Sequence, residues 1–207
     1  MATTDLASAR PATAEDLPEL SQALAAAFFD DPVLSWCYRD PGRRSEILPR
    51  FFAAIAEATL AAGGIYTTAD VVAGAIWIPP GAGGDDERLA ATLGEVSGEH
   101  AQRLFQLLEL IDAVHPTKSH HYLFVLGTRP EWQSRGIGSA LMAPVLETCD
   151  RDGIPAYLEA SSERNKALYL RHRFEVTQEL RLPEGPPIWC MWREPRDAGE
   201  KTNGGRR

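Results

Sequence analysis

The pattern of hydrophobic and polar positions predicts helices separated by short polar or glycine-rich breaks. Leucine, alanine and phenylalanine recur at intervals of three and four residues after Thr13, which is typical of a helix with one buried face. Thr13 and Asp16 have the spacing of a capping box at its start, and the Asp-Asp-Pro run at residues 30–32 predicts its end. Further helices are expected over residues 43–62, 86–114 with a weak point near 94–98, 137–149 and 164–171.

Runs of β-branched and aromatic residues predict the strands. The apolar run Tyr122–Thr128 is typical of a buried central strand, and Ile65–Thr68 with Val71–Ile78 predicts a hairpin. Further strands are expected up to about residue 10 and over residues 155–160, 174–182 and 188–193. Strands and helices that alternate in this way predict an α+β fold, in which helices cover a mixed sheet. We expect one domain over residues 1–193, followed by a polar, disordered tail at 194–207.

The composition narrows the class of partner. The 207 residues include 29 Asp and Glu against 21 Lys and Arg, which gives a formal net charge of -8. Clustered Lys and Arg supply non-specific nucleic-acid binding, so this acidic balance argues against a nucleic-acid partner. The longest apolar stretches are far shorter than the roughly 18 residues of a membrane helix, and residues 1–10 lack the pattern of a signal peptide. We therefore expect a cytoplasmic protein without a membrane partner.

The cysteines and histidines form no recognisable metal motif. Cys37, Cys149 and Cys190 lie far apart, so neither a CxxC redox pair nor a zinc knuckle can be drawn through them. His120 and His121 are adjacent in a predicted strand, where neighbouring side chains point to opposite faces, and they are interpreted as ordinary edge residues. We expect no metal.

The clearest local signal for a ligand is the loop Gln133-Ser134-Arg135-Gly136-Ile137-Gly138, between a predicted buried strand and an amphipathic helix. Two glycines allow tight turns, so that successive N–H groups can face one concavity at the positive end of the helix dipole. This geometry suits an anion such as a pyrophosphate. A glycine pair at such a turn is also common without a ligand, and the sequence lacks the third glycine of a dinucleotide fold and the lysine of a P-loop.

The residues around this loop resemble motif A of the GNAT superfamily of N-acetyltransferases. The matching segment is Leu126–Leu141, which contains the pattern Q/R-x-x-G-x-G/A. Downstream, Tyr157–Ser161 followed by Asn165, Ala167 and Tyr169 resembles motif B. The two motifs stand in the order of the family, and the resemblance extends over about residues 10–193.

Within this superfamily, the chain is similar to puromycin N-acetyltransferase and its actinobacterial relatives in three short segments: Leu158–Ser161, Pro183–Pro186 and Trp189–Met191. One position departs from the family pattern Tyr-x-x-x-Gly-Phe. Arg173 stands where the family has glycine, which leaves open the geometry of the turn after the predicted helix and of the adjacent pocket wall.

The resemblance implies a mixed, mostly antiparallel central sheet that is splayed at the site of acetyl-CoA, the cosubstrate. It also implies direct transfer of the acetyl group to an amine, without a covalent enzyme intermediate. Arg135 would add a cation beside the pyrophosphate, and Asn165 would either contact the cofactor or cap its helix. The predicted cofactor set is Leu126, Thr128, Gln133, Ser134, Arg135, Gly136, Ile137, Gly138, Ser139 and Asn165.

Two residues are candidates for proton transfer. Tyr169 is the candidate general acid for the departing thiolate, or else a packed aromatic on its short helix. Glu159 is the candidate general base for an ammonium substrate, or else a carboxylate satisfied by a backbone or arginine partner.

Aromatic residues and an acid are expected to form the pocket for the acceptor. The set is Phe28, Asp30, Trp36, Trp77 and Tyr122, which suits a cationic or aromatic amine, although each aromatic could instead belong to the core. We expect the primary amine of a small molecule as acceptor, for example a puromycin-like aminonucleoside. Two other functions stay open: a catalytically idle sensor or scaffold that binds acetyl-CoA, and a protein-lysine acetyltransferase. Both a monomer and a homodimer are compatible with the sequence.

Overall fold

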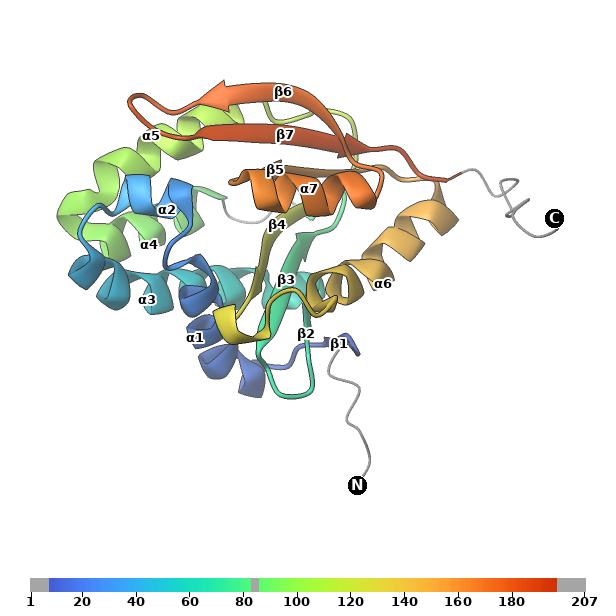
Figure 1. The fold of residues 1–207 in the computed structure, drawn as a ribbon, viewed down its shortest axis with the longest axis horizontal. Helices are drawn as coiled ribbons and strands as arrows, with labels where there is room; N and C mark the ends of the chain where they lie inside the picture. The colour runs from blue at the N-terminus through green and yellow to red at the C-terminus, as the bar shows by residue number, and fades with distance from the viewer. Residues whose placement is uncertain (1–7, 83–85, 197–207) are drawn as a thin grey trace, which may run out of the picture.

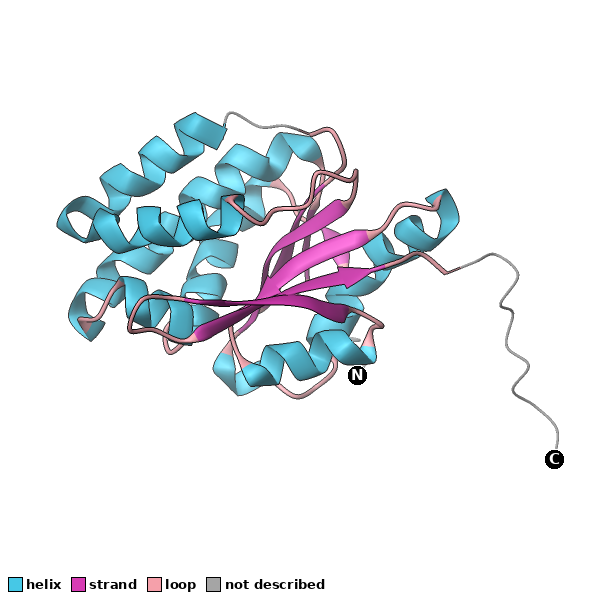
Figure 2. Ribbon diagram, turned by 90° about the horizontal axis from the view of Figure 1, so that it is seen from above, coloured by secondary structure: helices cyan, strands magenta, loops and turns pink. Residues whose placement is uncertain are grey.

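The structure, a computed structural model, describes residues 8–82 and 86–196. Within them the chain forms a seven-stranded sheet in the order β1-β2-β3-β4-β5-β7-β6, with helices on both faces (Figures 1 and 2). The strands are β1 (Arg10–Pro11), β2 (Ile65–Thr67), β3 (Ala73–Ile78), β4 (His121–Thr128), β5 (Ala156–Ala160), β6 (Glu175–Arg181) and β7 (Pro187–Arg193). The helices are α1 (Leu17–Phe28), α2 (Pro32–Cys37), α3 (Pro41–Thr59), α4 (Asp86–Ser97), α5 (Ala101–Asp112), α6 (Ile137–Asp152) and α7 (Glu163–Arg171).

The central strand β4 is paired differently along its two edges. β3 runs antiparallel to it along nearly its whole length. β5 runs parallel to it over three residue pairs only, from His121 with Ala156 to Leu123 with Leu158. Beyond Leu123 the two strands diverge (Figure 1), and within the described sheet this edge of β4 has no strand partner. Since the other neighbouring strands are antiparallel, the predicted fold class, including its splay, is confirmed.

Each face of the sheet carries its own hydrophobic core. α1 and α3 pack on one face, where α4 and α5 extend the layer, and α6 and α7 pack on the other. α1 crosses β4 very closely at Gly127, where an added Cβ atom would lie 3.0 Å or less from side-chain atoms of Leu24, Ala27 and Phe28. Glycine is therefore required at the point where the first helix meets the central strand, beside the splay.

The start of α1 follows the sequence prediction. Asp16 Oδ2 accepts a hydrogen bond from the backbone N–H of Thr13 at 2.8 Å, which gives the expected capping box before a 3-10 turn leads into the helix. The Arg10 guanidinium donates to both carboxylate oxygens of Asp16 at 2.8 and 2.7 Å, and this pairing holds the pKa of Asp16 well below its usual range.

The Asp-Asp-Pro run ends α1, as predicted, but it also begins α2, which the hydrophobic pattern did not predict. Asp31 is the N-cap of this short helix, and its Oδ1 accepts hydrogen bonds from the N–H groups of Val33 and Leu34 at 2.9 and 3.1 Å. Pro32 occupies the first helical position, where its missing N–H costs nothing. The same three residues therefore both stop one helix and start the next.

The other predicted elements are confirmed with small shifts at their ends. α3 begins at Pro41 and continues through a 3-10 turn to Ala62, and Gly63 adopts a left-handed conformation with φ 74°. The predicted weak point separates α4 from α5 at the 3-10 turn Gly98–His100. The predicted hairpin is β2–β3. None of the described helices combines the length and apolarity needed to cross a bilayer.

Two interpretations differ from the structure. His120 was interpreted as an edge residue, but β4 is a central strand, and His120 precedes it as a buried residue. The beginning of the polar tail makes specific contacts, because the Glu194 carboxylate accepts hydrogen bonds from Lys118 at 3.1 Å and from Trp192 at 2.8 Å. The predicted disorder of residues 197–207 concerns a segment outside the described residues.

Candidate active site

A cavity of about 750 Å³ opens where β4 and β5 separate. Its lining comes from the end of α1, the second half of β4, the glycine loop, the first turns of α6 and one side of α7. It contains nine of the ten predicted cofactor residues: Leu126, Thr128, Gln133, Ser134, Gly136, Ile137, Gly138, Ser139 and Asn165.

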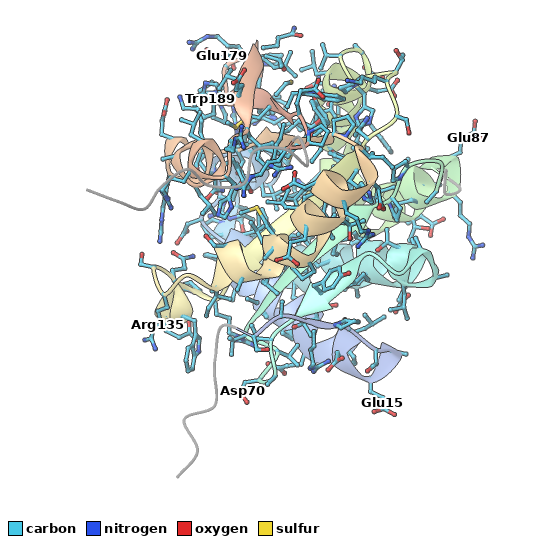
Figure 3. The ribbon with its side chains drawn as sticks, turned by 90° about the vertical axis from the view of Figure 1, so that its right-hand side faces the viewer. Glu15, Asp70, Glu87, Arg135, Glu179 and Trp189 are labelled. Atoms are coloured by element: carbon cyan, nitrogen blue, oxygen red, sulfur yellow. The ribbon has the colours of Figure 1, made fainter. Side chains whose placement is uncertain are left out.

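The exception is Arg135. Its guanidinium donates to the carbonyl of Glu131 at 3.0 Å and stacks 4.7 Å from the ring centroid of Trp132. Figure 3 shows the side chain at the surface of the molecule, projecting from the loop before α6. In this conformation the Arg135 side chain does not line the cavity.

The glycine loop has the backbone of an anion site. Ser134 and Gly136 both adopt left-handed conformations, with φ 62° and 81°, and α6 begins directly afterwards at Ile137. Alternation of left- and right-handed residues turns successive N–H groups toward one concavity, and the helix dipole adds positive potential there. The side chain of Gln133 ties the loop to β4, because its Nε2 donates to the carbonyl of Thr128 at 3.1 Å.

Arg164, on the first turn of α7, supplies the cation that Arg135 does not. Its guanidinium reaches across the cavity to the glycine loop, where it donates to Gln133 Oε1 at 2.6 Å and to Ser134 Oγ at 3.2 Å. Arg164 was not among the cofactor residues predicted from the sequence. Its position at the start of the helix after β5 was the available signal, but only the splay brings that helix opposite the loop.

A second cavity of about 140 Å³ adjoins the first. Its walls come from α3, α4, α5, β4 and β5, so the helices over residues 86–112 form part of its lining. Five residues line both cavities, and they mark where the two meet: Phe28, Asp31, Leu126, Asn165 and Tyr169.

Tyr169, on α7, is buried at this junction. Burial raises the pKa of its phenol, and the nearby charge of Asp31 raises it further, so the hydroxyl is neutral and a donor at neutral pH. Among the described residues, no hydrogen bond involves this hydroxyl. It is thus available to a ligand.

Asp31 connects the N-terminus of α2 to the end of β5. Besides capping α2, its carboxylate accepts a short hydrogen bond from the hydroxyl of Ser161, at the end of β5. Asn165 donates to the same Ser161 Oγ at 3.4 Å. Asn165 does not cap its own helix, because Ser162 does so by accepting from the N–H of Asn165 at 3.2 Å. Burial raises the pKa of Asp31.

Glu159, on β5, lines the second cavity with its side chain only 8 % exposed. Its Oε2 accepts a hydrogen bond from the Tyr122 hydroxyl at 2.6 Å, rather than from a backbone or arginine partner. Its Oε1 is buried without a hydrogen-bond partner among the described residues. Burial raises the pKa of Glu159 to about 7, although the hydrogen bond from Tyr122 opposes the shift. A carboxyl with this pKa can both accept and release a proton at neutral pH.

The predicted acceptor residues divide into two groups. Phe28 and Tyr122 line the second cavity, and Asp30 lines the first. Trp36 lies in the lining of neither and is held by a hydrogen bond from its Nε1 to the carbonyl of Pro183 at 2.9 Å. Trp77 is fully buried in the core between the sheet and α6, on the face opposite the second cavity, so the structure gives no support to an acceptor role.

Comparisons with known proteins relate this chain to acetyltransferases. Residues 77–174 match the model of the acetyltransferase (GNAT) family. A Schizosaccharomyces pombe protein described as an uncharacterized N-acetyltransferase is 26% identical over 207 residues, covering 90% of this chain and 83% of the relative.

Among solved structures, one from Corynebacterium glutamicum, described as histone acetyltransferase HPA2 and related acetyltransferase, has a TM-score of 0.70 and 26% identity, over 93% of this chain and 98% of that one. The polyamine N-acetyltransferase of Drosophila melanogaster, described as forming N-acetylagmatine, has a TM-score of 0.64 at 14% identity, over 90% and 98% of the two chains. At this lower identity the likeness concerns the fold.

Proposed function

We propose that this chain is a GNAT acetyltransferase that transfers the acetyl group of acetyl-CoA directly to the primary amine of a small apolar molecule, and the match of residues 77–174 to that family supports the proposal. The observation that carries this proposal is the meeting of two cavities at Tyr169, one shaped for a large anionic ligand and the other small and apolar. A transferase of this kind needs two substrates whose reacting atoms come together at one point.

The larger cavity has the features that acetyl-CoA requires. The left-handed turns at Ser134 and Gly136, the N-terminus of α6 and the guanidinium of Arg164 would hold the pyrophosphate. The edge of β4 that lacks a strand partner would pair with the pantetheine arm at Leu126 and Thr128. An N–H group on this edge would also stabilise the oxyanion of the transition state, a role worth about 3 kcal/mol in other acyl-transfer sites.

Proton transfer is assigned to Glu159 and Tyr169. The ammonium of the acceptor must lose a proton before its nitrogen attacks the thioester, and Glu159 would accept it because its pKa of about 7 leaves it partly ionised at neutral pH. Tyr169 would donate its hydroxyl proton to the departing thiolate, whose basicity also rises in a buried site. After the attack the nitrogen loses a second proton, which returns the phenolate of Tyr169 to the neutral phenol. One proton per turnover is then left for release to solvent.

The smaller cavity favours a monoamine with an apolar body. Its walls are mostly aliphatic and aromatic side chains of α3, α5 and β4, and the charged residues among its described lining are Asp31 and Glu159. Asp31 is engaged by the N-terminus of α2 and by Ser161, and Glu159 is assigned to proton transfer, so no acid is left for a second cation at the far end. An aminonucleoside of the puromycin type remains a candidate from the sequence resemblance. The volume of about 140 Å³ favours a smaller amine, since drug-sized ligands occupy about 300–1,000 Å³.

The direct test is thiol release from acetyl-CoA with a panel of amines at pH 8. We expect turnover with 2-phenylethylamine, at a higher kcat/KM than with agmatine, puromycin or a lysine peptide. Turnover with the peptide alone would identify a protein-lysine acetyltransferase. Tight CoA binding without turnover of any amine would identify an idle binding module.

The same assay tests Tyr169. Tyr169→Phe should lower kcat by roughly 10²-fold or more, with little change in the affinity for acetyl-CoA, because it removes only the hydroxyl at the junction. Tyr66→Phe is the matched control, since Tyr66 lines neither cavity. Parental activity in Tyr169→Phe would remove the general-acid assignment.

A further inference from the structure

The buried position of Glu159 creates a need for a proton exit. A base that takes one proton from each acceptor must lose it before the next turnover. The Glu159 side chain is 8 % exposed and faces an apolar cavity that the acceptor would fill. A side-chain neighbour outside the lining of this cavity would give the proton a path that the bound acceptor does not block.

The neighbours of Glu159 come from four segments. Tyr122 lies on β4, Tyr157 on β5, Cys190 on β7, and His115 in the segment between α5 and β4. Burial raises the pKa values of Tyr122, Tyr157 and Cys190, so none of these three groups ionises readily at neutral pH. An imidazole, in contrast, exchanges protons near neutral pH.

The distance to Glu159 and the exposure to solvent also favour His115 as the group that takes up the proton. Its Nδ1 lies 3.9 Å from Glu159 Oε1, the carboxylate oxygen without a hydrogen-bond partner among the described residues. A movement of about 1 Å of the ring or of the carboxylate would bring these two atoms within hydrogen-bond distance. The His115 side chain is 32 % exposed, so the group that contacts the buried carboxylate also reaches solvent.

Aromatic packing holds the His115 ring in this position. Its centroid lies 4.9 Å from that of Tyr122, 5.2 Å from that of Tyr157 and 5.1 Å from that of His120. His120 is fixed in turn, because its Nδ1 is 2.7 Å from the carbonyl oxygen of Lys118. The Lys118 ammonium sits over the Trp192 ring, 5.3 Å from the centroid, beyond His120.

We propose that His115 carries the proton from Glu159 to solvent in each turnover. The carboxylic acid formed when Glu159 deprotonates the ammonium gives its proton to the imidazole, the carboxylate is restored, and the imidazolium loses one proton to water. One proton leaves for each acetyl group transferred, and no other reactant is required. The proposal rests on the proposed function, and in particular on Glu159 as the base; His115 itself touches neither substrate and is a positioning and relay residue.

The test compares His115→Asn with His121→Asn, a matched change of the same residue type in the adjacent strand. With 2-phenylethylamine, or the best amine of the panel, His115→Asn should lower kcat about tenfold or more and leave the KM for acetyl-CoA unchanged. Added imidazole should restore the rate in a concentration-dependent way. His121→Asn should keep the parental kcat and show no response to imidazole.

A parental kcat in His115→Asn at every pH from 6 to 9 would overturn the relay. A loss of rate that imidazole does not rescue would overturn it as well, because a purely structural role predicts that result. The proposed function fails separately: Glu159→Gln would then retain full activity, or the parent protein would acetylate no amine.

Discussion

Replacing Tyr122 by phenylalanine should raise the pKa of Glu159 and move the activity to higher pH. The Tyr122 hydroxyl donates to Glu159 Oε2 at 2.6 Å. Phenylalanine keeps the ring that packs against Phe124 and His115, at centroid distances of 5.5 and 4.9 Å, and removes only this donor. The hydrogen bond stabilises the charged carboxylate, so its loss removes the largest contribution that opposes the effect of burial.

The size of the shift follows from the strength of the hydrogen bond. A hydrogen bond to a charged group contributes about 1.5–3 kcal/mol, and about 1.4 kcal/mol corresponds to one pKa unit. The pKa of Glu159 should therefore rise from about 7 by roughly 1–2 units. At pH 7 the ionised fraction would fall from about one half to between about one tenth and one hundredth.

The assay is the pH dependence of kcat/KM for the amine at saturating acetyl-CoA. The acid limb of the parent should lie near pH 7, and that of Tyr122→Phe near pH 8–9, with recovery of most of the parental rate above it. Tyr66→Phe again serves as the control and should leave the limb in place. An unchanged acid limb in Tyr122→Phe, or an equal loss of rate at every pH, would refute the reasoning.

Three further predictions concern stability and cofactor binding. Because the folded protein raises the pKa of Glu159 from 4.5 to about 7, it binds this proton more tightly than the unfolded chain, and stability falls as pH rises between these values, by up to about 3 kcal/mol. Glu159→Gln should therefore be more resistant to urea than the parent at pH 8 but not at pH 4, and equal resistance at both would contradict this linkage. Arg164→Ala should raise the KM for acetyl-CoA roughly tenfold through loss of the cation beside Ser134, whereas Arg181→Ala on β6 should leave this KM unchanged. An unchanged KM in Arg164→Ala would exclude a contact between Arg164 and acetyl-CoA. Arg173→Gly should raise the free energy of unfolding by about 0.5–1 kcal/mol, because Arg173 is held at φ 68°, whereas Arg171→Gly inside α7 should lower it. A lower free energy of unfolding in both variants would show that contacts of the Arg173 side chain outweigh the backbone strain.

Local patterns in the sequence were sufficient for most elements and for the glycine loop. The capping box at Thr13 and Asp16, the hairpin and the break at Gly98 each depend on neighbouring residues, so the chain alone specifies them. α2 was not predicted because the signal for a helix end and the signal for a helix start coincide at Asp31 and Pro32. The sequence left the turn at Arg173 open, and in the structure this residue adopts a left-handed conformation with φ 68°.

The side of the sheet on which a residue lies was harder to predict. The pairing of β3 with β4 shifts register between Ile76 and Trp77, and Trp77 lies on the α6 side, away from the second cavity. A bulge of this kind depends on the partner strand and leaves no clear trace in a single sequence. Asp30 and Asp31 show the same limit, because only the start of α2 determines that Asp31 reaches both cavities.

The two cavities have walls from different parts of the chain. Eight of the 22 residues that line the smaller one lie in helices α3 to α5, between residues 41 and 112, and none of these eight lines the larger one. Glu159 and Tyr169, in contrast, lie on β5 and α7. Under the proposed function, part of the acceptor pocket therefore comes from a stretch of sequence separate from the one that holds the proton-transfer residues. Substitutions among these eight residues would then change which amines fit the smaller cavity while Glu159 and Tyr169 stay in place.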